Sequence, residues 1–408
     1  MTVAQVKSYL ESIDFSWELI KLPENAYLVG GSVRDALLNR YKVPLDLDFV
    51  LPEKAIATAR KIANLNGGGF VVLDQVREIA RVVFPQGTLD LARQEGASLL
   101  ADLHRRDFTI NAIAYNIHLQ QLVDPLGGLK DIKQGVLRMV SPQNLEDDPL
   151  RLLRAYRQAA QLNFQIEAET RIAISDRISL LKTIAAERVQ AELNYIFTAP
   201  QGHKWLVSAI ADGLLEFWLP SINSSKIEQL KTLTEGMEYC FRLGLDLPEL
   251  AIFAHLATLV AAEPAIAEQE LSKLKYARAQ IKGVVKTVRY LPQLQQMSNP
   301  MSLREQYFWF LAVKDIFPVL IVRAIATGVS LKIIEPLIER YIEPTDPVAH
   351  PQSLVTGNDL IKQLNLKPSP IIGKLLTEIQ IAQIESKITT PQQAIEFANS
   401  LLQTINLF

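Results

Sequence analysis

Short hydrophobic runs separated by polar turns dominate the first third of the chain. Several runs of four to seven residues are rich in β-branched and aromatic side chains, which is typical of strands. The segment 53–65 instead places hydrophobic residues at every third or fourth position, which predicts a helix. This alternation indicates an α/β or α+β domain over residues 1–140. The predicted strands cover residues 26–29, 45–51, 70–73, 80–84 and 88–91.

Beyond residue 140 the hydrophobic period lengthens and strand patterns nearly disappear. Apolar residues recur at three-to-four spacing from residue 145 to the C-terminus, as in helices that bury one face. Prolines and polar clusters interrupt this pattern, and the proline-rich segment 343–351 is the best linker candidate. The most apolar stretch, 308–327, contains charged residues and a proline, so it predicts a buried helix pair and not a membrane span.

Composition narrows the class of protein. The chain has 408 residues, 49% of them hydrophobic, so we expect two or more domains with substantial cores. The single cysteine, Cys240, excludes an intramolecular disulfide, and the N-terminus lacks the apolar segment of a signal peptide. We therefore expect a cytoplasmic protein that does not bind membranes. A net charge of −2 gives no overall signature of nucleic-acid binding, so RNA contact would need a local basic surface.

A glycine pair marks the first candidate site. Gly30 and Gly31 follow a short apolar run and precede a predicted helix over 32–39, whose first turn contains Arg34 and Asp35. A backbone without side chains can approach a triphosphate closely, and helix N–H groups and a guanidinium can bind its oxygens. A tight turn followed by a surface arginine would give the same pattern.

Two aspartates supply the second candidate site. Asp46 and Asp48 are two residues apart on a predicted strand, so their side chains share one face while Leu47 and Phe49 point into the core. Two carboxylates aimed at one point suit Mg²⁺, which is usually held by one or two carboxylates and substrate phosphates. The pattern predicts a magnesium site for phosphoryl transfer.

Two further segments contain polar residues that could take part in phosphoryl transfer. Asp90 lies in the predicted strand 88–91, and pairing with the Asp46 strand would bring it to the metal as a general base. It could equally be an edge-strand residue that faces water. One of the two arginines, Arg105 or Arg106, could bind phosphate, while Asp107 and Asn111, at i, i+4 on a predicted helix through residue 114, bind a ribose or orient that arginine. A helix cap with solvated arginines is the alternative.

Another helix begins near a proline that follows two acidic residues. Arg151, Arg154 and Arg157 recur at three-residue steps and form a cationic strip beside Asp148. A carboxylate accepts from exocyclic amines and an arginine donates to ring nitrogens and carbonyls, so Asp148 and Arg151 could together pair with a base. A basic solvent face is the simpler alternative. Glu187, which opens a later helix, could hold one of the arginines in place.

In order and spacing, these segments resemble the class II tRNA nucleotidyltransferases, that is, the bacterial CCA-adding enzymes and their poly(A) polymerase relatives. The resemblance extends over nearly the whole chain. The residues that carry it are Gly30 to Asp35, Asp46 to Asp48, Arg105 to Ala112, Asp148 to Ala155, Glu187 with Arg188, and Leu354 to Leu360.

The resemblance implies an α+β fold, with a polymerase-β-like head that contains a mixed sheet, followed by all-α neck, body and tail domains. It implies Mg²⁺ as cofactor, tRNA and CTP or ATP as partners, and no protein partner. The implied domains are the catalytic head (1–140), the neck that recognises the base (141–200), the body (201–345) and the tRNA-binding tail (346–408).

The resemblance also assigns roles to residues. Asp46 and Asp48 would bind the metal ions, and a set of glycine and basic residues would bind the triphosphate. A protein template on the neck helix would pair with CTP or ATP, so that no nucleic-acid template is needed. The tRNA 3′ hydroxyl would then attack the α-phosphate and release pyrophosphate. The triphosphate residues are Gly31, Arg34 and Arg105, and the template residues are Asp148 and Arg151, with Arg154 and Arg157 completing the pocket.

One departure from the family pattern concerns the product. Only 11 residues, 94–104, separate Arg93 from Arg105. Members that complete CCA usually have a longer flexible segment here, and members that stop after CC have it shortened. This predicts a CC-adding enzyme, unless the short segment is compact yet competent for the final adenosine.

Rival interpretations remain open. A poly(A) polymerase shares the head chemistry but usually carries added basic surface. A small-molecule nucleotidyltransferase would not need the long helical remainder, and an RNA-binding scaffold with a decayed head would not need to keep Asp46 and Asp48. No histidine-based phosphohydrolase is expected, because the five histidines are scattered and His255 lacks a following aspartate.

Overall fold

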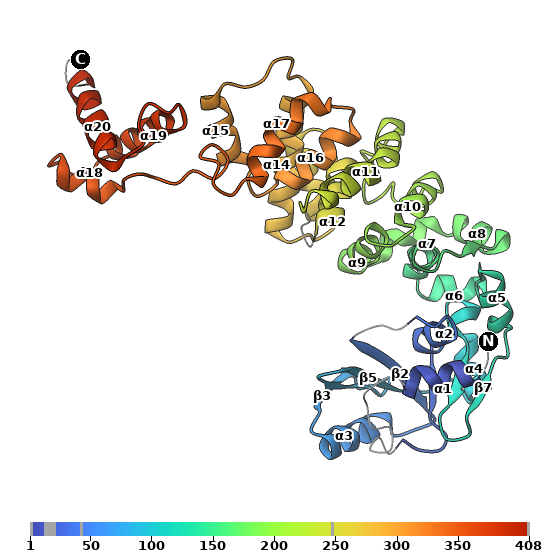
Figure 1. Ribbon diagram of the computed structural model, residues 1–408. Helices are drawn as coiled ribbons and strands as arrows, with labels where there is room; N and C mark the ends of the chain where they lie inside the picture. The colour runs from blue at the N-terminus through green and yellow to red at the C-terminus, as the bar shows by residue number, and fades with distance from the viewer. Residues whose placement is uncertain (1–2, 12–21, 41–43, 246–248, 406–408) are drawn as a thin grey trace. The chain divides into compact units, whose positions relative to one another are not determined.

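The structure is a computed structural model whose described part forms two compact units, Met1–Phe217 and Trp218–Phe408 (Figure 1). Head and neck, as delimited from the sequence, fall in the first unit. The finer four-domain division stays a prediction. The described residues are 3–11, 22–40, 44–245 and 249–405.

A mixed sheet of seven strands forms the first part of unit one, in the order β3-β4-β5-β2-β1-β6-β7. Strands β2 and β5 pair in parallel, whereas the other neighbouring strands of this sheet pair antiparallel. The sheet confirms the expected head fold and contains all five predicted strands. The strands are β1 (Tyr27–Val29), β2 (Leu45–Leu51), β3 (Gly69–Asp74), β4 (Ile79–Phe84), β5 (Gly87–Arg93), β6 (Ala114–Asn116) and β7 (Gln121–Val123).

The start of β5 is a glycine because the backbone of β2 passes too close for a side chain. A Cβ atom at Gly87 would lie 2.2 Å from the carbonyl oxygen of Leu45. The close parallel pairing places Asp46 opposite Thr88, and Asp48 opposite Asp90. The two strands therefore align their polar positions.

Helices complete the first unit. Helix α3 packs against β4 and β5, and α7 packs against α9 and α10. A second, two-stranded sheet joins β8 (Val136–Leu137) to β9 (Gln165–Ile166) in parallel. The helices are α1 (Val3–Glu11), α2 (Gly31–Leu37), α3 (Ala55–Asn66), α4 (Leu99–His104), α5 (Gly128–Gln134), α6 (Pro142–Asp147), α7 (Leu150–Leu162), α8 (Ala168–Ser175), α9 (Ala186–Phe197) and α10 (Gly202–Ala211), with 3₁₀ turns η2 (Thr109–Asn111) and η3 (Ile178–Thr183).

One predicted helix is wrong. The segment after Arg106 does not run as a helix through residue 114; it forms only the 3₁₀ turn η2 and then enters β6. Tertiary pairing decides the outcome, because β6 bonds to both β1 and β7, and the N–H of Thr109 bonds to the carbonyl of Arg138.

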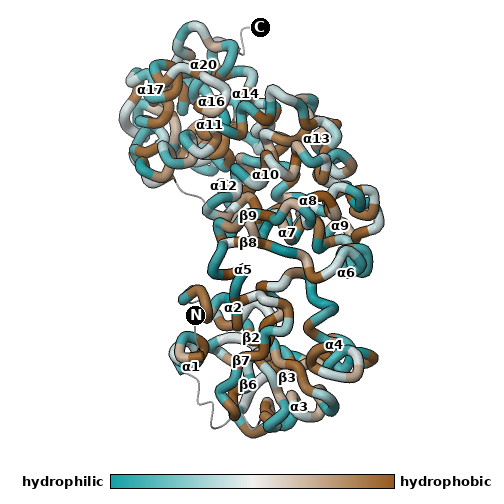
Figure 2. The backbone as a smooth tube through the Cα atoms, turned by 90° about the vertical axis from the view of Figure 1, so that its right-hand side faces the viewer, coloured by the Kyte–Doolittle hydropathy of each residue, from teal (hydrophilic) through white to brown (hydrophobic). Residues whose placement is uncertain are grey.

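The second unit is helical, as the three-to-four hydrophobic spacing predicts, and hydrophobic and hydrophilic positions alternate along its tube (Figure 2). The stretch 308–327 forms α15 and α16: α16 is almost entirely buried, as predicted, whereas α15 is only half-buried, with Phe308 and Leu311 exposed to solvent. The helices are α11 (Ser224–Arg242), α12 (Leu250–Leu259), α13 (Pro264–Lys273), α14 (Arg278–Gln295), α15 (Leu303–Val313), α16 (Phe317–Ala326), α17 (Leu331–Ile342), α18 (Gly357–Gln363), α19 (Pro370–Ile384) and α20 (Pro391–Ile405).

Within the described ranges, no single helix is long and apolar enough to cross a membrane. Helices α12 and α13 pass that test only as a pair, and the pair is bent by 117°.

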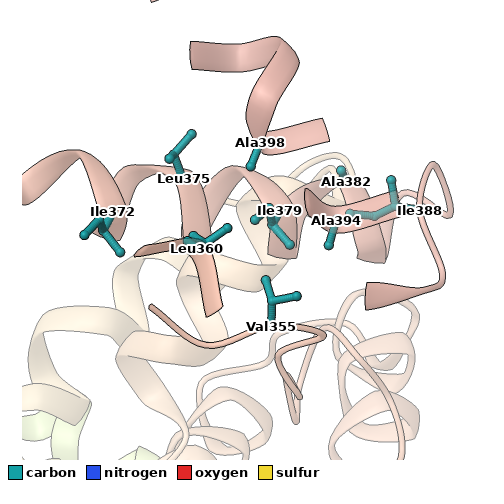
Figure 3. Packing of buried hydrophobic residues seen from close by; sticks show 9 residues of the cluster. All are labelled: Val355, Leu360, Ile372, Leu375, Ile379, Ala382, Ile388, Ala394 and Ala398. Carbon is teal, nitrogen blue, oxygen red and sulfur yellow. The ribbon is translucent and has the colours of Figure 1, made fainter. Parts of the chain in front are cut away.

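The last three helices share a small apolar core. Leu360 of α18, Leu375 and Ile379 of α19, and Ala394 and Ala398 of α20 are nearly inaccessible to solvent and pack together (Figure 3). Thr356 begins α18 with a capping box, in which its hydroxyl accepts from the N–H of Asp359 and donates to the Asp359 carboxylate.

Candidate active site

The two predicted metal ligands lie on β2 as expected. Leu47 and Phe49 are buried, while Asp46 is exposed and Asp48 is half-buried, so the alternation of the strand separates core and site. The hydroxyl of Thr88, on the paired strand β5, donates to Asp46 Oδ1 at 2.7 Å. This contact orients one carboxylate of the pair.

Asp48 is in an unfavourable position for a negative charge. Burial is the largest cause that raises its pKa to about 7, and the negative charges of Asp46 and Asp90 add to the shift. A divalent cation would relieve this repulsion, and carboxylate oxygens are the donors that Mg²⁺ prefers. Asp46 and Asp48 therefore fit the role of metal ligands.

Asp90 lies beside Asp48, as the predicted strand pairing requires, but its carboxylate is engaged. Arg81 on β4 donates from Nε and Nη2 to the two oxygens of Asp90, at 2.7 and 2.8 Å. Among the described residues no group of three His, Cys, Asp or Glu side chains could hold a metal ion. A general-base role for Asp90 stays a prediction.

The glycine turn comes close to Asp48 and to Arg106, the arginine next to the one that the resemblance assigns to the triphosphate. Gly30 has φ of 75°, a left-handed conformation that favours glycine, and a Cβ there would lie 3.2 Å from Arg106 Nη1 and 3.6 Å from Asp48 Oδ2. Arg106 donates to Asp102 at 3.0 Å, whereas Arg105, the predicted phosphate ligand, pairs with Glu95. The structure thus places Arg106 beside the turn and the predicted metal ligand Asp48, whereas Arg105 pairs with Glu95.

In the described structure Arg34 joins three elements by hydrogen bonds. Only 7% exposed, it contacts Asp35 through Nε at 2.9 Å and through Nη2 at 2.8 Å. Its Nη1 donates to Asn111 at 2.7 Å and to Gln158 at 3.3 Å. The guanidinium therefore joins α2 to η2 and to the neck helix α7. Its predicted role as a phosphate clamp stays a prediction.

A carboxylate at the centre of this network links the head to the neck. Asp107 accepts from Asn111 Nδ2 at 2.9 Å and from Arg154 Nη1 at 3.4 Å. Burial alone would raise the pKa of Asp107, but the charge of Arg154 and the hydrogen bond from Asn111 hold it below its usual value. The predicted pairing of Asp107 with Asn111 is present, although both residues lie around a 3₁₀ turn.

Glu192 holds the two arginines that are predicted to complete the base pocket. Arg157 Nε donates to its carboxylate at 2.6 Å, and Arg154 Nε lies 3.5 Å from the other oxygen. The expectation that Glu187 does this is wrong, because Glu187 is exposed at the start of α9 and Glu192 is buried one and a half turns later. Glu192 faces α7, and only the packing of α7 against α9 reveals that.

Asp148 and Arg151 each bond to another residue. Asp148 Oδ2 accepts from Arg188 at 2.9 Å, and Arg151 Nη1 donates to the carbonyl of Asn144 at 2.7 Å. Arg151 Nε is buried without a hydrogen-bond partner among the described residues, and burial lowers the pKa of this guanidinium. Arg151 therefore keeps donor capacity for a ligand.

Three domain families match the chain. The Poly A polymerase head domain matches residues 26–138, the probable RNA and SrmB-binding site of polymerase A matches residues 163–226, and the putative tRNA nucleotidyltransferase domain 2 matches residues 249–398.

Individual relatives agree with these matches. A CC-adding tRNA nucleotidyltransferase of Synechocystis sp. is 46% identical over 94% of this chain and 95% of its own. An A-adding tRNA nucleotidyltransferase of Deinococcus radiodurans is 30% identical over 92% and 95%. The Thermotoga maritima CCA-adding enzyme complexed with tRNA has the same fold, with a TM-score of 0.75 and 22% identity over 97% of this chain and 98% of that one.

The raised pKa of Asp48 predicts how stability depends on pH when no metal is present. Because the folded state binds the proton more tightly than the unfolded chain does, stability falls as pH rises from the ordinary pKa of 3.8 to about 7. In EDTA at pH 8, Asp48→Asn should therefore raise the free energy of unfolding by about 1–3 kcal/mol, and this gain should shrink toward pH 4.

Urea unfolding at both pH values measures this effect. Glu53→Gln, which removes an exposed carboxylate from the same unit, is the control and should change little. If Asp48→Asn and the parent protein are equally stable at pH 8, the charged Asp48 carboxylate does not destabilise the folded state and the prediction is wrong.

The network predicts different outcomes for two glutamates of the same helix. Glu192→Gln removes the charge that Arg154 and Arg157 share, and should lower the free energy of unfolding by about 1–3 kcal/mol. Glu187→Gln should change it by less than about 0.5 kcal/mol, since that side chain is exposed. Chemical unfolding of both variants tests this, and the reverse order would restore Glu187 as the residue that holds the arginines.

Proposed function

The chain belongs to the tRNA nucleotidyltransferase family and is a nucleotidyltransferase, and from that membership we propose that it adds the two cytidines of the tRNA CCA end and stops there. A CC-adding relative is 46% identical, and an A-adding relative is 30% identical. The second enzyme that this implies would add the terminal adenosine.

The segment 94–104 carries the proposal. It is short and tied at both ends: the N–H of Glu95 donates to Asp102 at 3.0 Å, the Glu95 carboxylate pairs with Arg105, and the hydroxyl of Ser98 caps α4. To accept ATP after CTP, the base pocket must change shape within one catalytic cycle. A short segment that is held by this many internal contacts is not flexible enough to drive that change.

The neck would select the nucleotide. Asp148 can accept from the exocyclic amine of cytosine, while Arg151 can donate to its ring nitrogen and carbonyl oxygen. Arg154, Arg157 and Arg188 each pair with a carboxylate, whereas the described ion pairs of the chain do not include Arg151. This difference supports Arg151 as the arginine that binds the base.

The head would carry out the transfer. Asp46 and Asp48 would hold Mg²⁺, which when bound stabilises negative charge on the phosphates. Gly30 and Gly31 leave room for the triphosphate, and Arg106 beside them can donate to its oxygens. Asp90, held by Arg81, keeps a carboxylate next to Asp48, where it could accept the proton of the tRNA 3′ hydroxyl.

The product of the reaction tests the proposal directly. Purified protein is incubated with Mg²⁺, CTP, ATP and a tRNA that ends at the discriminator base, and the 3′ ends are sequenced. We expect ends in CC even with ATP present, and no extension by Asp46→Ala. Ends in CCA would contradict the stop after CC, and long adenosine tails would favour a poly(A) polymerase.

Two neighbouring aspartates test the base contact. Asp148→Asn replaces an acceptor by a group that can present a donor, so kcat/KM for CMP transfer should fall about 10- to 100-fold, as expected for loss of a charged hydrogen bond. Asp147→Asn alters an exposed neighbour in α6 and should leave kcat/KM nearly unchanged. Steady-state kinetics with CTP measure both, and equal losses would argue against a base contact by Asp148.

A further inference from the structure

The second unit contains a cavity of about 290 Å³ that the proposed reaction does not use. It lies among the start of α11, the end of α12, and helices α14 and α16. Apolar side chains such as Val288 and Leu291 form part of its wall, but two cationic side chains, Lys226 and Arg323, also line it. A mostly apolar cavity with a few convergent polar groups is typical of a small-ligand site.

Arg323 is buried and incompletely satisfied. The residue is 4% exposed, and Nη2 donates to Gln229 Oε1 at 2.9 Å. Its Nε and Nη1 are buried without a hydrogen-bond partner among the described residues, and the ion pairs described for the chain do not include it. Burial lowers the pKa of Arg323 to about 10, so the group stays charged at neutral pH. A buried charge without a partner is costly unless an anion completes it.

Lys226 adds a second cation to the same cavity. Its ammonium donates to the carbonyls of Leu259 and Val260, which leaves one of its three N–H donors available. Lys226 also lies in the first turn of α11, where helix N–H groups favour negative charge. The nearby carboxylate is Glu270, whose oxygens accept from the N–H groups of Ser221 at 3.1 Å and Ala261 at 2.7 Å. Positive charge therefore exceeds negative charge here.

We propose that this cavity binds a phosphate group carried by a small molecule, with Arg323 as the principal ligand and Lys226 as the second. A guanidinium matches phosphate oxygens geometrically, and the N–H groups on Nε and Nη1 of Arg323, which have no partner among the described residues, supply donors. An RNA backbone phosphate is flanked by sugars on both sides, and a guanidinium that is 4% exposed is out of its reach. The occupant is therefore a free phosphate, a pyrophosphate or a small phosphate ester.

Inorganic phosphate and pyrophosphate serve as probes. The full-length protein is titrated with each in EDTA at constant ionic strength, and binding is followed by calorimetry and by thermal unfolding. We expect saturable binding that Arg323→Gln weakens about ten-fold or more, as loss of a charged hydrogen-bond donor would. Lys226→Gln, which can still donate to the two backbone carbonyls, should weaken it as well.

Two matched variants locate the binding. Lys231→Gln removes an exposed charge from the same helix, and Arg106→Gln removes the cation that lies beside the glycine turn of the head; both should bind phosphate as the parent protein does. If Arg323→Gln does not fold, Lys226→Gln alone tests the proposal.

Several results would overturn the proposal. These are the absence of saturable binding by the parent protein, binding that persists in both Arg323→Gln and Lys226→Gln, and binding lost in Arg106→Gln, which would place the phosphate in the head. Unchanged phosphate binding together with weakened tRNA binding in the two cavity variants would show a contact to RNA instead.

Discussion

The parallel pairing of β2 with β5 is the constraint on which the active site depends. It places Asp48 opposite Asp90 and brings Thr88 into contact with Asp46, so three carboxylates and a hydroxyl meet on one face of the sheet. Burial, together with this proximity to Asp46 and Asp90, raises the pKa of Asp48 to about 7. The sheet therefore holds like charges close together at the expense of stability, which is what a metal and triphosphate site requires. Gly87 permits this pairing, because a side chain there would collide with Leu45.

A buried polar network then couples this sheet to the helices that follow. Arg34 on α2 meets Asn111 and Gln158, and Asp107 meets Arg154, so residues from the head and from α7 satisfy one another. Removal of any member leaves a buried partner unsatisfied. The arginines of α7 are thereby fixed relative to Asp46 and Asp48 within the first unit. Selection of a base by protein side chains needs this rigidity, because a mobile side chain would not discriminate between bases.

Features that depend on residues close together in the sequence were predicted correctly. The β2 strand was predicted with the bounds found, 45–51, because alternation of leucines with aspartates is a strong period-two signal. The apolar stretch interrupted by charges correctly predicted a helix pair, of which α16 is buried and α15 only half-buried. Glu192 and Gln158 were missed, and Arg105 was preferred to Arg106, because their positions depend on helix packing and strand pairing, which bring together residues up to 124 positions apart. The helix expected after Arg106 failed for the same reason: pairing of β6 with β1 and β7 overrode a local spacing.

Ion pairing divides the arginines into two groups: those whose charge a carboxylate of the protein compensates, and those whose N–H donors remain available for a ligand. Arg81, Arg154, Arg157 and Arg188 each face a carboxylate, so their charges are already compensated by the protein. Arg151 and Arg323 have buried nitrogens without such compensation. Folding tolerates an uncompensated buried guanidinium only where a ligand or solvent completes its hydrogen bonds. The same physical criterion therefore identifies Arg151 in the neck and Arg323 in the second unit, although their surroundings differ: Arg151 lies beside a carboxylate that can share a base, and Arg323 beside a second cation that can share a phosphate.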